Sequence, residues 1–371
     1  MASIIKWAGG KEKELPYIIQ NAPEYFEDYY EPFVGGGSVF MAINANHYYI
    51  NDLSVELNQL YQYIKSQDET FFELLTNLCI IWDKATSFFT SKCEVLISIY
   101  LKYRNGDYSE GDIKEELNCL CDKSQSQIID ILPQSLCKNK QKLILETSSS
   151  LFHKMRRMRK IEVSKNLLPE KDIADNIETA IKSAVYTYLR MLYNDKEMSP
   201  LTHCCLFFFV RNYAYSGMFR YNKKGDFNVP YGGIAYNKKS LQPKIDYYRS
   251  EELVRHFSEA TITGLDFESF FELYPPKPND FVFLDPPYDS DFSTYAQNEF
   301  SQSDHKRLAH YLIHNHNVRC KWLMIIKSTP FIMSLYSKIS NINISSFDKE
   351  YQVSFMNRNQ KKATHLIIKN Y

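Results

Sequence analysis

The chain contains 371 residues, with 44 basic and 44 acidic side chains, so its formal net charge is zero. This length can bury one large core together with an inserted domain. The zero balance excludes a strongly basic protein, so any contact with a polyanion must rely on local patches.

Cysteine spacing and hydropathy exclude further classes. The eight cysteines form no paired C-x-x-C motif, which argues against a structural zinc site. The start of the chain is polar from Lys6 onward, unlike a signal peptide. The longest markedly apolar run, residues 204–210, is far shorter than the ~18 residues of a membrane span. We therefore expect a soluble, cytoplasmic protein that holds no metal.

Residues 1–66 alternate between helical and strand patterns, ending in a helix. Within them, Tyr-Glu-Pro-Phe-Val-Gly-Gly-Gly-Ser-Val-Phe at 30–40 predicts a strand end, a glycine turn and a helix start, with Ser38 as a possible cap. Because glycine has no side chain, Gly35 and Gly37 let the backbone approach a ligand closely. The segment lacks the G-x-G-x-x-G fingerprint of dinucleotide sites and the lysine of a P-loop.

A second short strand at 48–51 ends at Asp52, about 20 residues beyond the start of the glycine turn. An acidic residue at that distance typically takes the ribose hydroxyls of an adenosine-containing cofactor. Because the pyrophosphate-binding spacing is missing, S-adenosylmethionine fits better than a nicotinamide cofactor. The alternative is an ordinary βαβ crossover without a ligand.

From Asp68 to about Tyr193 the pattern is mostly helical, and we expect residues 67–199 to form a helical insertion. The clearest amphipathic helix covers residues 176–189. Residues 153–160 carry six basic side chains in eight positions. Such a run is either a solvated helix face or a contact to the DNA backbone.

Residues 200–258 predict a helix near 206–210, a hairpin at 211–233 and a helix near 240–257. Lys223 and Lys224, with Lys238 and Lys239, flank a tyrosine-rich stretch. Basic and aromatic side chains together suit phosphates and unstacked bases. A solvated loop with buried tyrosines is the alternative.

Residues 260–267 then read as a strand that ends in an acid, Asp266, which serves either as a helix cap or as a cofactor contact. The apolar run at 281–284 reads as a buried strand, followed by Asp285, Pro286, Pro287 and Tyr288. Open α/β sheets bind ligands at the carboxyl ends of their strands. The alternative is a proline turn that only ends the strand.

The Asp-Pro-Pro-Tyr motif suits methylation of an exocyclic amine, whose lone pair is delocalised into its ring. A carboxylate and a main-chain carbonyl that accept the two N–H bonds draw this lone pair out of conjugation. Proline supplies a carbonyl without an N–H, and its fixed φ stiffens the loop. Tyr288 offers a flat face on which a base can stack.

The remaining pattern predicts a helix from Asp304 to about Asn315, a strand at 321–326 and a helix at 330–338. Strands near 342–347 and 363–369 are expected to form an antiparallel pair at one edge. The prediction is an α/β fold with a doubly wound, mostly parallel sheet, built from residues 1–66 and 259–371.

These motifs, in this order, resemble the Dam-like DNA adenine-N6 methyltransferases. Lys6-Trp7-Ala8-Gly9-Gly10-Lys11 is similar to the N-terminal cofactor motif of that family, and Asn51-Asp52-Leu53 to its ribose-binding turn. Residues 211–222 and 225–232 resemble its DNA-reading hairpin, and residues 358–369 its C-terminal strand. The resemblance covers residues 1–66 and 200–371, and residues 67–199 lie outside it.

The resemblance implies a Rossmann-like methyltransferase sheet with an inserted DNA-recognition region, S-adenosylmethionine as donor, S-adenosylhomocysteine as product and duplex DNA as partner. It also implies a monomer encoded by a bacterium or a phage. The donor contacts would be Trp7, Lys11, Phe33, Gly35, Gly37, Asp52, Asp266 and Asp285, and the catalytic residues Asp285, Pro286, Pro287 and Tyr288. The DNA contacts would be Tyr215, Ser216, Met218, Arg220, Asn222, Lys223, Lys224, Pro230 and Tyr295.

Arg220 resembles the guanine-reading arginine of the family, which points to a GATC-like recognition site. Two other classes remain as alternatives. Methyltransferases acting on RNA or on a protein glutamine use related loops but lack the Trp-Ala-Gly-Gly-Lys start and the Arg-Tyr-Asn hairpin. The other alternative is a non-catalytic DNA-binding relative, against which the intact Asp285 and Asp52 argue.

Overall fold

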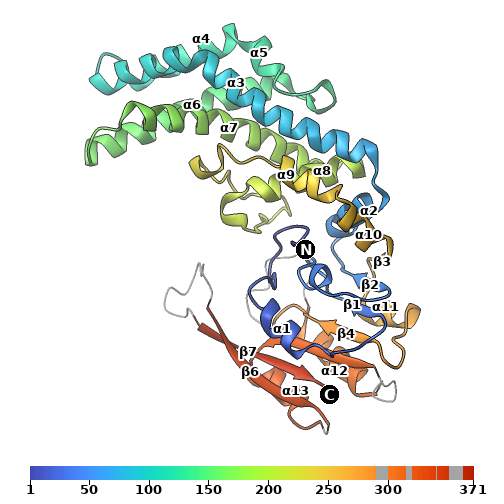
Figure 1. Ribbon diagram of the computed structural model, residues 1–371. Helices are drawn as coiled ribbons and strands as arrows, with labels where there is room; N and C mark the ends of the chain where they lie inside the picture. Colours follow the sequence, from blue (N-terminus) through green and yellow to red (C-terminus); the bar gives the residue numbers. More distant parts are fainter. Residues whose placement is uncertain (290–299, 315–319, 340, 351–361) are drawn as a thin grey trace. The chain divides into compact units, whose positions relative to one another are not determined.

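The structure, a computed structural model, describes residues 1–289, 300–314, 320–339, 341–350 and 362–371 (Figure 1). The chain forms two compact units. The first, called the sheet unit, contains Met1–Ser66 and Tyr248–Tyr371; the second, called the helical unit, contains Gln67–Tyr247.

In the described part of the sheet unit, seven strands form one sheet. They are β1 (Tyr29–Glu31), β2 (Tyr48–Asn51), β3 (Ala260–Thr263), β4 (Phe281–Leu284), β5 (Lys321–Lys327), β6 (Asn343–Glu350) and β7 (Lys362–Lys369). Their spatial order is β3-β2-β1-β4-β5-β7-β6. β1 to β5 pair in parallel, whereas β7 is antiparallel to both of its neighbours.

Helices cover both faces of the sheet. One face packs Tyr30, Val282 and Trp322 against α11 (Phe267–Leu273), α12 (Gln302–His314) and α13 (Pro330–Tyr336). On the other face the Tyr29 ring contacts Tyr48 and Phe281, and Tyr48 contacts Phe40. The Phe40 ring in turn packs on α10 (Glu251–Ser258), which packs on α2 (Val55–Ser66). Successive strand residues point to opposite faces, so the sheet joins two apolar layers.

The strand order reverses between β1 and β4. β2 and β3 follow β1 on one side, whereas β4 and β5 lie on the other. In open α/β sheets, the crevice at the carboxyl ends of two such strands is the usual ligand site. Here the glycine turn follows β1 and the Asp-Pro-Pro-Tyr motif follows β4, so both motifs begin at the reversal point.

The predicted doubly wound α/β fold and the antiparallel edge pair are confirmed. Two local predictions are wrong. Ser38 is not a helix cap, because the glycine turn leads only into a short 3-10 helix, η1 (Phe40–Ala42), which no side chain caps and which returns to extended backbone at Ile43. The single helix expected at 240–257 is two helices, α9 (Gln242–Tyr248) and α10, since Ser250 begins a new helix by accepting a bond from the Leu253 amide.

The helical unit contains α3 (Glu69–Asn105), α4 (Glu110–Lys123), α5 (Gln125–Ile129), α6 (Lys140–Ser164), α7 (Glu170–Tyr193) and α8 (Pro200–Tyr213), with short 3-10 turns (Figure 1). α7 packs against α3, α6 and α8. Asp68 caps α3 through the Phe71 amide, and Gly106 ends it with a φ of 90°. None of the described helices is both long and apolar enough to cross a membrane.

The basic run at 153–160 lies on α6. Arg156 is already committed to an ion pair with Glu110 of α4 (2.9 Å), whereas Arg157 and Lys160 are exposed. The run is therefore in part a connection within the helical unit.

The chain after α8, residues 214–237, is called the recognition segment. Its arms pair antiparallel at two isolated bridges, Ala214 with Tyr231 and Tyr221 with Phe227. The first three residues of the predicted hairpin belong to α8 instead. Ser216 and Gly217 have positive φ values of 53° and 63°, so the backbone turns sharply directly after Tyr215.

Candidate active site

The Asp-Pro-Pro-Tyr motif meets the N-terminal segment of the chain through Lys11. The Lys11 ammonium forms an ion pair with the Asp285 carboxylate and also donates to the Tyr288 hydroxyl (3.2 Å) and the Gly9 carbonyl (2.8 Å). The Lys11 side chain is only 3% exposed, whereas Asp285 retains 18%. The ring of Tyr288 also lies 5.4 Å from that of His365, on β7. A charged, partly open carboxylate therefore stands at the end of β4.

The glycine turn is packed tightly under Trp7. A Cβ at Gly36 would lie 2.3 Å from the Ile5 carbonyl oxygen, and one at Gly35 would lie 3.0 Å from the Trp7 ring. Gly35 and Gly37 also have positive φ values of 50° and 75°, which side chains disfavour. The turn thus requires glycine, and it leaves its backbone uncovered by side chains of its own.

Asp52 follows β2 and joins this turn. Its carboxylate accepts from the Gly35 amide (2.9 Å) and the Ser54 amide (2.8 Å). Burial raises the pKa of Asp52, and the two amide bonds oppose that rise. Each oxygen of a carboxylate can accept a second bond, so the group can hold the turn and still bind a hydroxyl. This carboxylate acceptor and the glycine backbone without side chains fit the adenosine portion of S-adenosylmethionine.

Asp266 lies at the end of β3 and caps α11 by accepting from the Glu268 amide (3.1 Å). It also pairs with Arg307 of α12 (2.6 Å), which reaches Asp304 as well (2.9 Å). The helix-cap interpretation is therefore confirmed. Nearby, the Phe33 ring contacts Phe267 and Phe300 and is only partly buried.

Glu31, the last residue of β1, is 2% exposed and accepts from the Tyr29 hydroxyl (2.8 Å). Burial raises the pKa of Glu31 well above its usual range, and the negative charge of Asp285 adds to that rise. Burial therefore disfavours the ionised form of Glu31 in the layer beneath the site.

The recognition segment presents its predicted DNA contacts in different ways. Tyr215 is 49% exposed at the turn beside the exposed Ser216, and Met218 is half-buried. Lys223, Lys224 and Pro230 are exposed. The Asn222 side chain instead shapes its own loop, accepting from the amides of Lys224 (2.8 Å) and Asp226 (3.0 Å). Tyr295 lies outside the described residues.

Arg220 is exposed, yet its guanidinium is held by one residue. Nε donates to the Asn228 side-chain oxygen (2.8 Å), and Nη2 donates to the Asn228 carbonyl (3.1 Å). The arginine that resembles a base-reading residue is therefore oriented before any DNA arrives.

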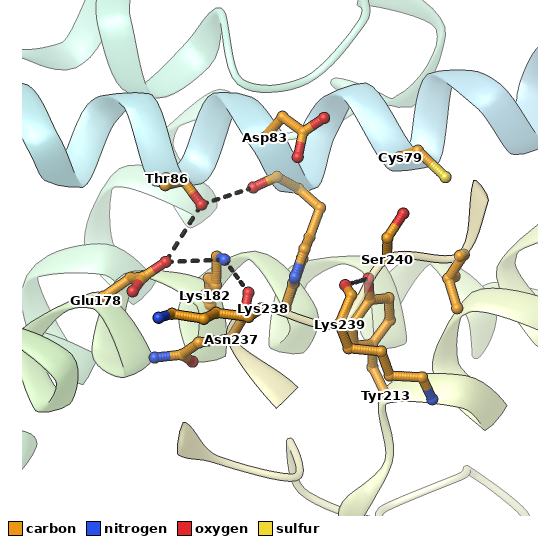
Figure 2. Close-up of a pocket in the computed structure, with 12 residues that line it drawn as sticks. Cys79, Asp83, Thr86, Glu178, Lys182, Tyr213, Asn237, Lys238, Lys239 and Ser240 are labelled. Carbon is orange, nitrogen blue, oxygen red and sulfur yellow. Dashed lines mark hydrogen bonds and ion pairs between the residues drawn. The ribbon is translucent and has the colours of Figure 1, made fainter. Parts of the chain in front are cut away.

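The helical unit contains a cavity of about 260 Å³, lined by residues of α3, α7 and the chain at 237–241 (Figure 2). Two of its charged groups satisfy each other. Lys182 forms an ion pair with Glu178 (2.9 Å) and donates to the Asn237 carbonyl. Thr86 donates to the same Glu178 carboxylate (3.2 Å). We therefore interpret this cluster as an anchor for the chain at 237–241. In the described residues, no group of three or more acidic, histidine or cysteine side chains is placed to hold a metal ion.

Comparison with known protein families identifies the chain. The model of the D12 class N6 adenine-specific DNA methyltransferases matches residues 7–353, which include the glycine turn, the recognition segment and the Asp-Pro-Pro-Tyr motif. The chain belongs to this family. It is an adenine-specific DNA methyltransferase, and membership implies that S-adenosylmethionine is the methyl donor.

Individual relatives agree with this D12 assignment. The chain is 35% identical to the Type II methyltransferase M.CviBI of Paramecium bursaria Chlorella virus NC1A over 168 residues, which are 44% of this chain and 60% of that protein. It is 23% identical to the Type II methyltransferase M1.LlaDCHI of Lactococcus lactis subsp. cremoris, across 99% of this chain and 94% of the relative. The DNA adenine methylase of Escherichia coli K12 is 22% identical over 83% of this chain and 74% of its own length.

The contacts that three residues of this D12 methyltransferase site make were not predicted from the sequence. Asn51 is 1% exposed, and its amide donates to the carbonyls of Pro32 (3.0 Å) and Leu265 (2.9 Å), so it ties the loops after β1 and β3 together. Tyr61 donates to the Gly35 carbonyl (2.5 Å), and Arg307 pairs with Asp266. The position of Asn51 next to Asp52, at a strand end, was the one available signal.

Proposed function

We propose that this D12 methyltransferase methylates N6 of adenine within a short duplex DNA sequence, using Asp285 and the Pro286 carbonyl to activate the amine. The observation that carries this proposal is the arrangement at the strand-order reversal. There the Asp285 carboxylate, the Lys11 ammonium and the Tyr288 hydroxyl meet after β4, and the glycine turn follows the adjacent β1.

Asp285 and the Pro286 carbonyl each accept one N6–H bond, which returns electron density to the nitrogen. Tyr288 stacks on the base and limits its rotation. S-adenosylmethionine, when bound, supplies the methyl group from its sulfonium centre. Because the reacting atoms must lie in line, positioning and electrostatics account for the catalysis.

Trp7, Phe33, Gly35 and Gly37 would hold the donor at this edge of the sheet. Asp52 accepts from the ribose hydroxyls through the lone pairs that the Gly35 and Ser54 amides leave available. Lys11 holds the Asp285 carboxylate in place, and Asp266 closes the adenine side of the site together with its helix cap.

The target adenine lies inside the base stack, so it must be flipped out, which costs a few kcal/mol. Tyr215, with Ser216 and Met218 beside it, is proposed to fill the gap that the flipped base leaves. Contacts to the DNA around the site are proposed for Lys223, Lys224, Asn222 and Pro230, and for Tyr295 from the resemblance alone.

Arg220 is proposed to read one guanine through its O6 and N7 atoms, a geometry that a planar guanidinium matches and lysine does not. A GATC-like sequence is the expected site. We expect the enzyme to act as a monomer in the cytoplasm of a bacterium or of a phage-infected cell.

The test is to incubate the purified chain with methyl-labelled donor and equal masses of duplex DNA, RNA and protein. We expect the label in N6-methyladenine of the duplex. Label in RNA or in protein glutamine, with none in duplex DNA, would overturn the proposal. Modified-base sequencing of a plasmid expressed with the chain then gives the recognition sequence, and it overturns the GATC-like expectation if no guanine is required.

A further inference from the structure

The pairing of Arg220 with Asn228 crosses the two arms of the recognition segment. Besides the two guanidinium bonds, the backbone N–H of Asn228 donates to the Arg220 carbonyl (3.1 Å). Asn228 therefore binds both the backbone and the side chain of Arg220. A long exposed arginine would otherwise sample many rotamers, and ordering it during binding lowers affinity.

The bonds to Asn228 occupy one edge of the guanidinium only. An arginine has five N–H donors, and Nε with one hydrogen of Nη2 form its side edge. The end edge, formed by Nη1 and the second hydrogen of Nη2, is left for another acceptor pair. Reading guanine at O6 and N7 requires two such donors in one plane. The bonds to Asn228 thus fix the orientation of the guanidinium and leave its end edge available for guanine.

Asn228 is itself held on both sides by helix α7 and its cap. Asn194 exchanges two bonds with Phe227: its side-chain oxygen accepts from the Phe227 amide (2.9 Å), and its amide donates to the Phe227 carbonyl (3.0 Å). On the other side of Asn228, the Val229 carbonyl accepts from Arg190 (2.7 Å) and Tyr186 (3.0 Å).

The three side chains that hold this arm, two on α7 and one at its C-cap, are spaced four apart, at 186, 190 and 194, so they share one face of the helix. The same face continues toward the start of α7, where Lys182 bonds the Asn237 carbonyl (Figure 2). Thr179 bonds the side chain of the same Asn237, at the end of the recognition segment. The insertion therefore fixes the second arm of the segment by polar side chains along a single helix face.

We propose that Asn228 is a positioning residue that sets the base-pair discrimination of Arg220, and that α7 fixes it in place. The inference rests on the proposed guanine-reading role of Arg220. Asn228 touches the reading residue rather than the substrate. Its loss should therefore blunt discrimination at one base pair instead of weakening contact with all DNA.

The experiment measures kcat/KM on the methylated sequence and on duplexes with one substituted base pair each. Asn228→Ala should lower discrimination at the base pair read by Arg220 by roughly tenfold, the size expected for one lost bond to a charged donor. Asn228→Asp keeps the acceptor oxygen and should retain the discrimination. The control Asn176→Ala, whose side chain bonds its own helix at the Asp172 carbonyl (2.8 Å), should leave every ratio unchanged.

Arg220→Ala and the double variant separate this inference from the function on which it rests. If Arg220→Ala relaxes one base pair but Asn228→Ala lowers all duplexes equally, Asn228 is a general DNA contact and the inference is wrong. If Arg220→Ala relaxes no base pair, the reading role itself fails and the inference fails with it. If the inference is right, adding Asn228→Ala to Arg220→Ala causes no further loss of base-pair discrimination. Thermal unfolding of each variant distinguishes these outcomes from misfolding.

Discussion

The catalytic edge of the sheet unit and the recognition segment of the helical unit assemble functional residues by different means. At the catalytic edge, Asp52 lies more than 200 residues before Asp266 and Asp285 in the chain, yet each of the three follows a parallel strand of one sheet. In the recognition segment, all the predicted DNA contacts in the described residues lie within 214–237, in chain that has two isolated bridges and no regular strand.

This comparison separates two sources of precision. Parallel strands bring their carboxyl ends to one edge whatever their side chains are, so the backbone hydrogen bonds of the sheet place the catalytic groups. An irregular segment has few such bonds and depends on side chains that donate to its carbonyls and accept from its amides. Changes at the catalytic edge should therefore affect chemistry or donor binding, whereas changes along α7 should affect the order of the segment.

The largest expected effect is that of Asp285→Ala. It removes the acceptor proposed to activate N6, so methyl transfer should fall below detection while DNA affinity stays within about tenfold. The methylation rate measures methyl transfer, and a filter-binding or anisotropy titration measures DNA affinity. Asp122→Ala, at an exposed position in α4, is the control and should leave both unchanged. Substantial turnover by Asp285→Ala would mean that another group activates the amine.

Asp52→Ala should weaken binding of S-adenosylhomocysteine by about 1.5–3 kcal/mol, the range for losing hydrogen bonds to a charged group. Calorimetry measures this value directly. Tyr61→Phe is the matched control, because it removes the bond to the Gly35 carbonyl but leaves the Asp52 carboxylate in place. An unchanged dissociation constant for Asp52→Ala would leave this carboxylate with the structural role of holding the glycine turn.

Asn194→Ala tests the other half of the comparison. The variant leaves the amide and the carbonyl of the buried Phe227 without their side-chain partner, so stability should fall by about 1–3 kcal/mol. Hydrogen exchange should quicken in the recognition segment, and donor binding should not change. The matched change Asn176→Ala should neither lower the stability nor quicken hydrogen exchange in the recognition segment. If exchange quickens equally throughout the protein, α7 stabilises the whole chain rather than the segment.

The same contrast explains what the sequence could predict. The order of apolar runs and the acids that end them were sufficient to predict the sheet, its edge pair and the convergence of the two motifs. The links made by Asn51 and Arg307 were not predicted, because each joins loops that are distant in sequence. Likewise, Tyr186 lies in the amphipathic helix predicted at 176–189, whereas Arg190 and Asn194 lie beyond it. Their polar role depends on which carbonyls and amides lie opposite, and no spacing rule encodes that.

The smallest expected effect concerns the buried acid beneath the catalytic edge. Burial raises the pKa of Glu31, so as pH rises above the ordinary value near 4.5 the folded protein retains this proton to a higher pH than the unfolded chain does. Stability from this group is thus complete below about pH 4.5 and falls as pH rises toward the raised pKa, by up to about 1.4 kcal/mol per pH unit. Glu31→Gln keeps the shape and the Tyr29 contact but removes this slope, so its stability relative to the natural protein should improve as pH rises above about 4.5 toward the raised pKa. Thermal unfolding across that range measures the difference, with the exposed Glu24→Gln as control.

Parallel curves for Glu31→Gln and the natural protein would show that Glu31 is ionised in the fold. In that case a second carboxylate charge would lie beneath Asp285, and the ammonium of Lys11 would have to balance both.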